Sequence, residues 1–451
     1  MPSRYSEEEA VQKPASELLR KMGWELVYAY NDEELGQYGT LGRKSYHEVV
    51  LRRYLVDAIV ELNEWLEVEE CEHAADTLMA TLATDTLLQT NEKKYAMLRD
   101  GIPVEKRRDD GTKYTEYAQV FDFEHPEYNR FIAVEEMWVE GPLYKRRPDL
   151  MGFVNGIPLL FVEFKRHDKG VRRAYEDNYT DCQDTIPQLF HFNAFVMLSN
   201  GLEAKVGTLG SKYEFFHEWK RLAEGMPGSV DLETMLRGMC GKRAFMDLFE
   251  NFILFDHSGP TAAKILARNH QYLGVNEAVA SYVNRDIREG KLGVFWHTQG
   301  SGKSYSMVFL ARKIKRKFAG SPTFLVVTDR EELNKQIAAT FAGCGCMPAT
   351  DASAYIAKSG ADLAQRLKGN PSFVFTLIQK FNDVRAEPIH TDHDVIIFCD
   401  EAHRTNNGLL ADNMTRMLPE ASRLGFMGTP LFSYDNITER TFGSYVSVYD
   451  F

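Results

Sequence analysis

Hydrophobic spacing changes along the chain, and each change predicts a different kind of secondary structure. In residues 1–60, apolar side chains recur at near-helical intervals, as in Leu18, Leu19 and Met22, which predicts helix. From about Gln119, apolar and β-branched runs alternate with Gly, Pro and Asn, which predicts a mixed sheet. These runs are QVFDF, RFIAVEEMWVE, LMGFVNG, IPLLFVEFK and FNAFVMLSNG.

The second half of the chain follows another pattern. Helix-like segments, EFFHEWKRL and FMDLFENFILF, occupy residues 215–265 among turn-rich sequences. After Val283, the apolar runs GVFWH, TFLVVTD, SFVFTLI, DVIIFCDE and RLGFMGT alternate with helical stretches, which is typical of parallel βαβ units. We expect an α/β protein with a mixed-sheet domain at 1–240, a helical connector at 241–263 and a parallel-sheet domain at 264–451.

Composition narrows the class of protein. With 44% hydrophobic and 26% charged residues, the chain has the balance of a globular protein. Its six cysteines show no zinc-site spacing. The sequence lacks a long apolar run and a signal peptide, so we expect a soluble cytoplasmic protein with no membrane partner. The net charge of −12 argues against coating of nucleic acid by the whole surface, so any DNA contact must be local.

A glycine-rich sequence follows the predicted strand GVFWH and precedes a helical run. It consists of Gly300, Ser301, Gly302, Lys303 and Ser304. Glycines let backbone N–H groups crowd around a polyphosphate, a Lys reaches its outer phosphates, and a hydroxyl binds Mg²⁺. The first glycine of GxxxxGK[ST] would fall at His297, so the pattern is incomplete and a purely structural turn stays an alternative.

A second motif supports an ATP site. The apolar strand from Asp394 ends in Asp400 and Glu401. Carboxylates at such a strand end can hold the hydration shell of Mg²⁺, the predicted role of Asp400, and orient or deprotonate the attacking water, the predicted role of Glu401. Together the two motifs predict binding and hydrolysis of ATP.

A different set of residues predicts phosphodiester chemistry. Asp149 and Glu163 flank an Asn-Gly turn, and Lys165 follows Glu163 by two positions. Strand side chains alternate, so Glu163 and Lys165 face the same side, and a hairpin brings Asp149 to the same end. Two carboxylates can hold Mg²⁺, and a Lys can position water and stabilise the phosphate. D…ExK also occurs by chance in many strands.

These motifs resemble known families. GSGKS, DEAH and GFMGTP (425–430) look like motifs I, II and III of superfamily 2 helicases and translocases, 323–336 is similar to motif Ia, and 375–381 to the next DNA-contact segment. Arg268 and Gln271, within RNHQY, resemble the adenine-reading Q motif. The segment from Arg147 to Lys165, with IPQLF and VMLSNG after it, resembles the PD-(D/E)xK core of restriction subunits of type I restriction–modification enzymes.

The resemblance implies an ATP-dependent DNA translocase and endonuclease that cleaves unmodified duplex DNA away from its recognition site. It implies ATP and Mg²⁺ as cofactors, and modification and specificity subunits as partners. Asp149 and Glu163 would bind one metal, and Ser304 and Asp400 the other. Motifs IV to VI of the second motor domain are not in the sequence, so we expect residues 1–451 to bind ATP without DNA-stimulated hydrolysis.

Some features depart from the family or leave alternatives open. A QxxxY element that helps arrange the nuclease site would fall at Asn178 and Cys182. An N-terminal carboxylate, Glu17 or Glu48, can also join the metal site or be an ordinary solvated helix residue. Two other functions stay open: a stand-alone helicase–nuclease of repair type, and a nucleotide-gated DNA-binding or assembly module with an inactive nuclease.

Overall fold

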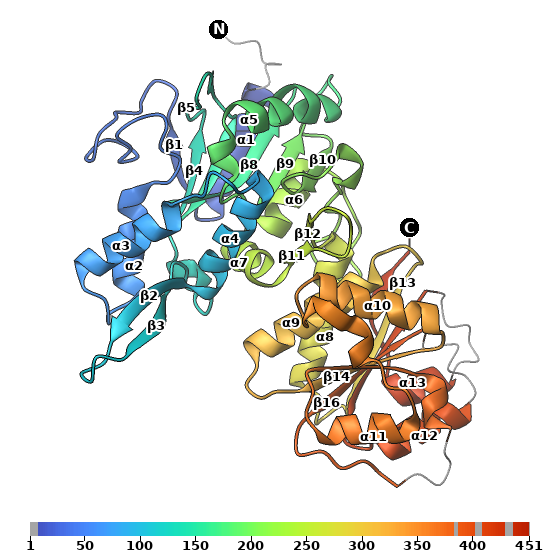
Figure 1. Ribbon diagram of the computed structural model, residues 1–451. Helices are drawn as coiled ribbons and strands as arrows, with labels where there is room; N and C mark the ends of the chain where they lie inside the picture. The colour runs from blue at the N-terminus through green and yellow to red at the C-terminus, as the bar shows by residue number, and fades with distance from the viewer. Residues whose placement is uncertain (1–7, 383–386, 402–407, 429–435, 451) are drawn as a thin grey trace. The chain divides into compact units, whose positions relative to one another are not determined.

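The computed structural model describes residues 8–382, 387–401, 408–428 and 436–450. They form two compact units (Figure 1). The first runs to Leu222 and includes Pro227–Ile253 and Lys264–Leu266; the second comprises Ala223–Met226, Leu254–Ala263 and the chain from Ala267 onward. Each unit has its own six-stranded sheet. The fold is therefore mixed α/β, as the sequence predicts.

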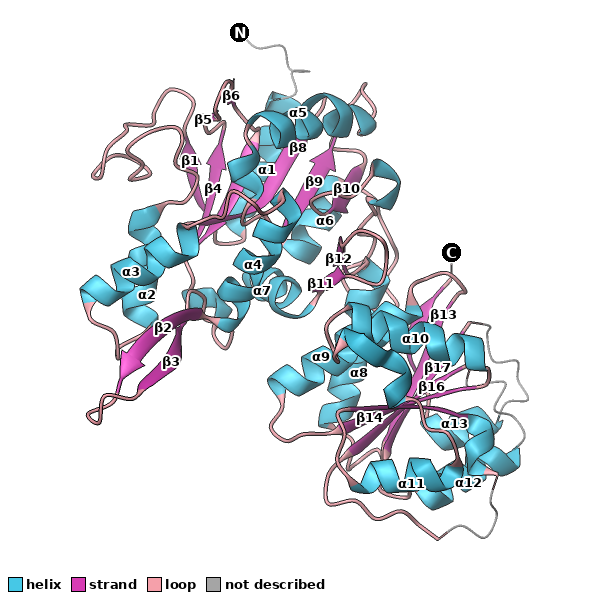
Figure 2. Ribbon diagram, in the orientation of Figure 1, coloured by secondary structure: helices cyan, strands magenta, loops and turns pink. Residues whose placement is uncertain are grey.

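The first sheet has the order β1-β4-β7-β8-β9-β10 and contains both parallel and antiparallel pairs. Figure 2 shows helices on both of its faces. The strands are β1 (Glu25–Tyr28), β4 (Phe131–Glu135), β7 (Leu150–Val154), β8 (Ile157–Phe164), β9 (Phe195–Ser199) and β10 (Ala204–Gly207); β2 (Ile102–Arg107) pairs with β3 (Lys113–Ala118), and β5 (Val139–Glu140) with β6 (Lys145–Arg146).

Aromatic packing fixes the helices of this unit to the sheet. On one face Trp24 packs edge-on against Phe131 and Phe245, and on the other Phe161 packs against Tyr179 and Phe190. Such pairs stabilise a core beyond their apolar area alone. The helices are α1 (Lys13–Lys21), α2 (Arg52–Leu62), α3 (Val68–Met79), α4 (Leu87–Asp100), α5 (Thr180–Thr185), α6 (Leu232–Met239) and α7 (Lys242–Asn251).

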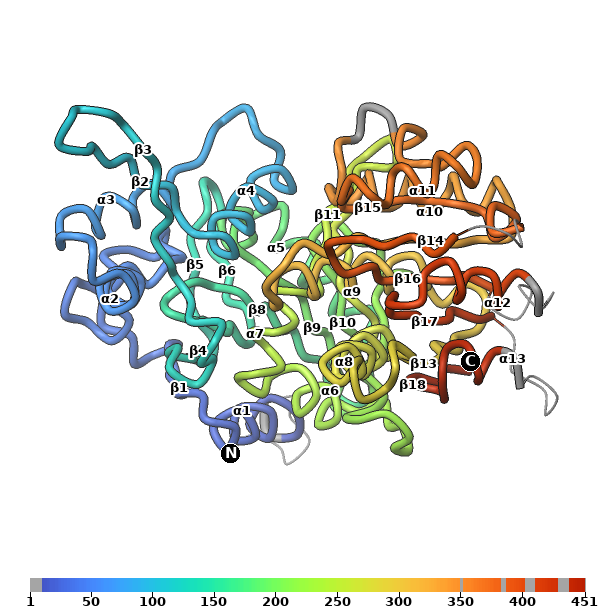
Figure 3. The backbone as a smooth tube through the Cα atoms, turned by 90° about the horizontal axis from the view of Figure 1, so that it is seen from below, coloured from blue at the N-terminus to red at the C-terminus, as the bar shows by residue number. Residues whose placement is uncertain are grey.

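The second sheet is parallel throughout, in the order β15-β14-β16-β17-β13-β18 (Figure 3). Its carboxyl-terminal edge collects the loops that follow each strand, where open α/β sheets bind ligands. The strands are β13 (Lys291–His297), β14 (Thr323–Thr328), β15 (Phe373–Leu377), β16 (Val395–Asp400), β17 (Ser422–Met427) and β18 (Tyr445–Tyr449); the helices are α8 (Asn269–Val283), α9 (Lys303–Lys317), α10 (Glu331–Gly343), α11 (Gly360–Lys368), α12 (Gly408–Met417) and α13 (Asn436–Phe442).

Several expected elements differ from the structure. Residues 25–28 form strand β1 where the spacing predicts helix, because they pair with β4. QVFDF lies beyond the end of β3 and is not a strand. Residues 214–222 contain the end of a short 3₁₀ turn and a β-bridge from His217 to Val206, where the spacing predicts helix. In 241–263, α7 is followed by β11 (Ile253–Asp256), which pairs with β12 (Ala263–Leu266), so this segment is not wholly helical. For β1 and for β11–β12, strand pairing overrides local propensity.

Candidate functional sites

The β7–β8 hairpin places two of the candidate nuclease residues at one end of the first sheet. Asn155 and Gly156 form its turn with φ of 47° and 81°, the left-handed conformations of a type I′ turn. Leu150 pairs with Val162, so Asp149, just before β7, lies beside the carboxyl end of β8. That end carries Glu163, which is buried. The sequence-predicted hairpin is confirmed.

Asn178 connects two of the three candidate residues by hydrogen bonds. Its amide nitrogen donates to Oε2 of Glu163 at 2.8 Å, and its amide oxygen accepts from Nζ of Lys165 at 2.7 Å. The backbone N–H of Phe164 donates to Oδ2 of Asp149 at 2.7 Å. The π-helical segment Ala174–Tyr179 thus supplies the group that holds Glu163 and Lys165 on one side. Asp149, Glu163 and Lys165 come together here.

The two carboxyl groups are placed where ionisation is costly. Burial raises the pKa of Glu163 well above 4.5, with the neighbouring Asp149 as the next cause. Burial likewise raises the pKa of Asp149, opposed by the hydrogen bond from Phe164. Two adjacent carboxylates, of which Glu163 is buried and Asp149 partly buried, are stabilised by a shared proton or by a cation. This donor set fits Mg²⁺, which commonly takes one or two carboxylates and keeps several waters.

The other candidate residues, Glu17, Glu48 and Cys182, have different contacts or a different ionisation behaviour. Glu17 forms an exposed ion pair with Arg20, and the Glu48 carboxylate accepts from the backbone of Lys44. Cys182 is buried, and burial raises the pKa of its thiol, so the thiol is neutral. Within the described residues, no three or more His, Cys, Asp or Glu side chains form a metal cluster. The site therefore rests on the Asp149–Glu163 pair.

Gln12 is a neighbour of this site that the sequence does not single out. It is buried and donates from its side-chain amide to the backbone carbonyl of Asp149 at 3.3 Å. It lies just before α1, where a buried Gln cannot be distinguished by spacing from other residues at the start of a helix. Its contact fixes the backbone that carries Asp149.

The phosphate-loop candidate connects β13 to α9. Gly300 and Gly302 have φ of 83° and 87°, a region that favours glycine. His297 ends β13; its ring lies 2.7 Å from Oγ of Ser447, and its carbonyl accepts from Nζ of Lys303 at 3.2 Å. His297 therefore occupies a strand position, and the positive φ angles fall at the two later glycines. Ser301 is buried, and Ser304 is the second residue of α9.

The Q-motif candidates contact this loop. The amide nitrogen of Gln271 donates to the carbonyl of Gly302 at 2.9 Å, and its amide oxygen accepts from the backbone N–H of Arg268 at 2.8 Å. A Cβ added to Gly302 would lie 2.8 Å from that amide nitrogen. Both ends of the Gln271 amide are therefore engaged beside the loop. A side chain at position 302 would collide with this amide, so position 302 requires glycine.

The ends of β14, β16 and β17 lie near a second pair of carboxylates, Asp400 and Glu401. A Cβ added to Gly428, after β17, would lie 3.3 Å from both Nζ of Lys303 and Oε1 of Glu401. Asp400 ends β16 and is buried, and burial, with the adjacent Glu401, raises its pKa to about 6. Asp329, after β14, also raises it, a contribution that the motifs do not indicate. His403, Thr429 and Pro430 fall outside the described residues.

The environment of Asp400 fits a nucleotide-bound metal. Among the described residues, its Oδ1 is buried without a hydrogen-bond partner. A buried carboxylate oxygen without a donor costs free energy, and a hydrated cation would satisfy it. Lys303 opposes the rise in the Asp400 pKa, which places a positive charge near it. Lys303, Asp400 and Glu401 come together, with the Gly300–Gly302 loop before them in the chain.

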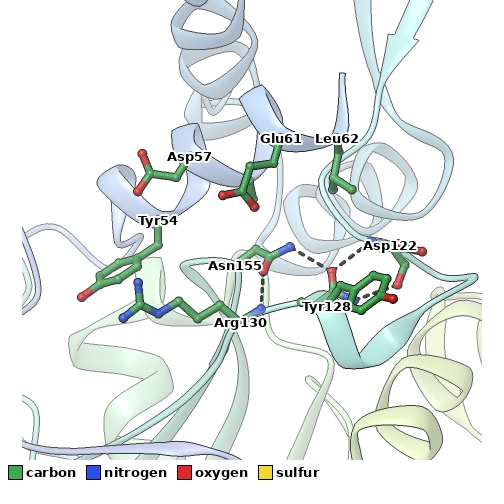
Figure 4. Close-up of a pocket in the computed structure, with 10 residues that line it drawn as sticks. Tyr54, Asp57, Glu61, Leu62, Asp122, Tyr128, Arg130 and Asn155 are labelled. Atoms are coloured by element: carbon green, nitrogen blue, oxygen red, sulfur yellow. Dashed lines mark hydrogen bonds between the residues drawn. The ribbon is translucent and has the colours of Figure 1, made fainter. Parts of the chain in front are cut away.

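A separate cavity of about 360 Å³ lies elsewhere in the first unit (Figure 4). Asp57 and Glu61 of α2 face Arg130, which precedes β4, and Asn155, which follows β7. Asn155 accepts from the backbone of Arg130 at 2.7 Å. Because β4 begins and β7 ends here, the cavity is at the opposite end of these strands from Asp149. It is not part of the candidate nuclease site.

Comparison with known proteins identifies both halves of the chain. Residues 4–215 match the type I restriction enzyme R protein N terminus family, and residues 270–451 match the SWI2/SNF2 ATPase family. The type I restriction enzyme HindI endonuclease subunit of Haemophilus influenzae is 33% identical over 98% of this chain and 44% of its own length. A relative from Methanocaldococcus jannaschii, named for a subunit of the same kind, is 30% identical over 99% of this chain and 44% of its own length.

The chain covers only part of each relative. The chain spans less than half the length of these two curated relatives. Among solved structures, the UvsW helicase of bacteriophage T4 is 18% identical over 43% of this chain and 63% of its own, with a TM-score of 0.32, too low to carry an argument. In the described part of the chain, no helix has the length and apolar character needed to cross a bilayer.

Proposed function

We propose that this chain is the nuclease-bearing and ATP-using part of a type I restriction subunit. The proposal is supported by the matches of residues 4–215 to the type I restriction enzyme R protein N terminus family and of residues 270–451 to the SWI2/SNF2 ATPase family. The observation that carries the nuclease proposal is the bridge from Asn178 to Glu163 and Lys165. Two adjacent carboxylates are costly in a purely structural role, whereas a metal-dependent phosphodiesterase uses such a pair to hold Mg²⁺.

In the nuclease reaction, Asp149 and Glu163 would hold Mg²⁺, which supplies charge to the phosphate and lowers the pKa of a bound water. Lys165 contributes a positive charge that positions the attacking water and stabilises the developing negative charge on the phosphate. Asn178 keeps Lys165 and Glu163 in register through the two ends of its amide. Phe164 holds Asp149 by its backbone N–H.

In the ATPase reaction, the loop N–H groups and Lys303 bind the β- and γ-phosphates, and Ser304 and Asp400 would hold the Mg²⁺ that accompanies ATP. Glu401 orients or deprotonates the attacking water. Arg268 and Gln271 form the adenine side. ATP hydrolysis then moves duplex DNA, and cleavage follows away from the recognition site, with modification and specificity subunits as partners in the cytoplasm.

Reconstitution tests this proposal. The full-length subunit, combined with its modification and specificity partners, should cut unmodified circular duplex DNA when ATP and Mg²⁺ are present. Lys303→Ala should stop both ATP hydrolysis and cutting, because the contact to the outer phosphates is lost. Cutting that persists in Lys303→Ala, or cutting without the partner subunits, would instead support a stand-alone nuclease.

A further inference from the structure

A row of aromatic and cationic side chains lies beside the nuclease carboxylates. Tyr28 ends β1, which runs parallel to β4, and pairs with Glu135 at the end of β4. Glu135 pairs in turn with Leu150, next to Asp149. The β5–β6 hairpin brings further members of the row to the same end. We call the row the cation–aromatic ladder; its members are Tyr28, Tyr30, Tyr46, Trp138, Lys145 and Arg147.

The rings contact one another, and the two cations lie over ring faces. Tyr30 packs edge-on against Tyr28 at 6.4 Å and stacks with Trp138 at 6.2 Å between centroids. The Arg147 guanidinium lies 4.1 Å from the Tyr30 centroid. The Lys145 ammonium lies 4.7 Å from the Trp138 centroid and 3.5 Å from that of Tyr46. The ladder therefore offers flat apolar surfaces interleaved with positive charges.

The ladder is accessible, and its charge is only partly neutralised. Tyr28 and Tyr30 are 38% and 39% exposed. Arg147 forms an ion pair with Glu136 at 3.0 Å. Lys145 is exposed and pairs with no carboxylate of the described residues, its contacts being to ring faces. The chain as a whole is acidic, so a local cationic and aromatic surface is the kind of place where a polyanion could bind it.

The fold does not need the exposed rings for anchoring. The loop after β1 is held by Arg43, which is buried, binds both carboxylate oxygens of Glu33 and donates to the carbonyl of Trp138 at 3.1 Å. This anchor is independent of Tyr28 and Tyr30. Surface tyrosines beside cations bind flat, negatively charged ligands well, because bases stack on rings while phosphates meet the cations.

We infer that the cation–aromatic ladder binds an unpaired nucleotide of the DNA strand next to the phosphate that is cut. Tyr30 stacks on the base, and Lys145 and Arg147 contact the flanking phosphates. Arg147 is two residues from Asp149, so their Cα atoms are at most about 7 Å apart, within reach of one strand. The inference rests on the proposed nuclease function and adds that its DNA-binding surface prefers a locally unpaired strand.

The test compares two DNA ligands on the same 451-residue chain, with EDTA present to prevent cutting. Fluorescence anisotropy measures affinity for a duplex with a short single-stranded gap and for the fully paired duplex. Tyr30→Ala should weaken binding to the gapped DNA about tenfold and to the paired duplex less than about twofold. Tyr30→Phe, which keeps the ring, should bind like the native chain. Tyr128→Ala is the matched control, because Tyr128 is also exposed but lines the cavity at the other end of the sheet.

Two further measurements locate the contact. Lys145→Gln should weaken binding to both ligands and lower the salt dependence by about 0.7–0.9 in the logarithmic slope. Photo-crosslinking of the gapped DNA carrying 5-iodouracil in the gap should attach it to the tryptic peptide 22–43, and Tyr30→Ala should reduce that product. Because the second unit can bind DNA too, this peptide map separates ladder binding from binding elsewhere.

The outcomes are distinguishable. If native chain binds DNA but Tyr30→Ala leaves gapped-DNA affinity and the crosslink unchanged, the inference fails while the proposed function stands, and the ladder becomes a candidate protein-binding surface. Equal loss on both ligands in Tyr30→Ala would also overturn base stacking. If the native chain binds neither DNA, the inference fails, while the proposed nuclease function is decided separately by the cutting assay on the reconstituted complex.

Discussion

Asn178 illustrates how one side chain can set the geometry of a reactive pair. A carboxylate and an ammonium could pair directly, but here the amide lies between Glu163 and Lys165. Each group thereby keeps part of its hydrogen-bonding capacity for a ligand. The sequence pattern predicts which carboxylates and lysine meet, since strand alternation determines it. The family resemblance points to Asn178 as a helper position, but the bridge itself depends on a π-helical segment that local spacing does not reveal.

Replacement of Glu163 by Gln should stabilise the metal-free protein at neutral pH. The folded-state pKa of Glu163 lies above its ordinary value of 4.5, so the folded state binds the proton more tightly. Native stability is therefore fully present below about pH 4.5 and falls as pH rises towards the raised pKa. Glu163→Gln should reduce this fall and gain about 1–2 kcal/mol in EDTA.

Denaturant unfolding across a pH series, with EDTA and with Mg²⁺, measures this effect. Mg²⁺ should stabilise the native chain more than it stabilises the Glu163→Gln variant, because the cation compensates the charge of the ionised carboxylate pair. A variant that is less stable than the native chain in EDTA at neutral pH, or that shows the same pH dependence, would contradict a destabilising buried pair at this position.

The raised pKa of Asp400 predicts that binding of Mg-ATP depends on pH. With a pKa raised to about 6, Asp400 is protonated in acid and cannot hold the hydrated metal of ATP. The Kd of Mg-ATP should therefore rise by up to about tenfold per pH unit below about pH 6. Asp400→Asn should bind weakly and keep only the pH dependence of the nucleotide itself. Titration calorimetry would contradict the prediction if both proteins showed one pH profile.

Elements depend on partners as well as on sequence, and the strands show this most clearly. The Asn-Gly turn between β7 and β8 is predicted because both residues adopt positive φ with little strain. β1 and β18 are not predicted. β1 is short and has its parallel partner at β4, about a hundred residues on by the register. Among the strands that the structure describes, β18 lies at the sheet edge and pairs with β13 alone, a pairing that no local pattern encodes.

Gly156→Ala tests whether this hairpin holds the nuclease site together. Gly156 has φ of 81°, and an added Cβ would lie 2.4 Å from the carbonyl oxygen of Leu51. Gly111, in the β2–β3 turn, has φ of 85° with nothing within 4 Å. Gly111→Ala should cost about 1 kcal/mol from the backbone alone, and Gly156→Ala about 2–4 kcal/mol because it adds a backbone clash.

The unfolding free energy of both variants, from denaturant titration, decides this point. An equal loss of unfolding free energy in the two variants would show that the structure around Leu51 relaxes freely and that the hairpin is not fixed there. If Gly156→Ala is the more destabilised variant, cleavage should fall with it, because the turn sets the register that brings Asp149 beside Glu163.

At the scale of the whole molecule, the two candidate sites lie in two compact units. The motifs predict this division because each needs its own strand ends: a hairpin for Asp149 and Glu163, and parallel strands for Lys303 and Asp400. The division of the chain near residue 223 is less predictable, because residues 223–226 and 254–263 belong to the second unit while 227–253 belong to the first. Such crossing segments follow from tertiary contacts alone.

We propose that ATP use and DNA cutting are separate activities of separate units. This separation is tested by following ATP hydrolysis and plasmid cutting in one reaction, with Glu163→Gln in the full-length subunit reconstituted with its partners. We expect loss of cutting with DNA-stimulated ATP hydrolysis unchanged, because Glu163 and the phosphate loop lie in different units. Loss of ATP hydrolysis together with cutting, or cutting that persists, would contradict it.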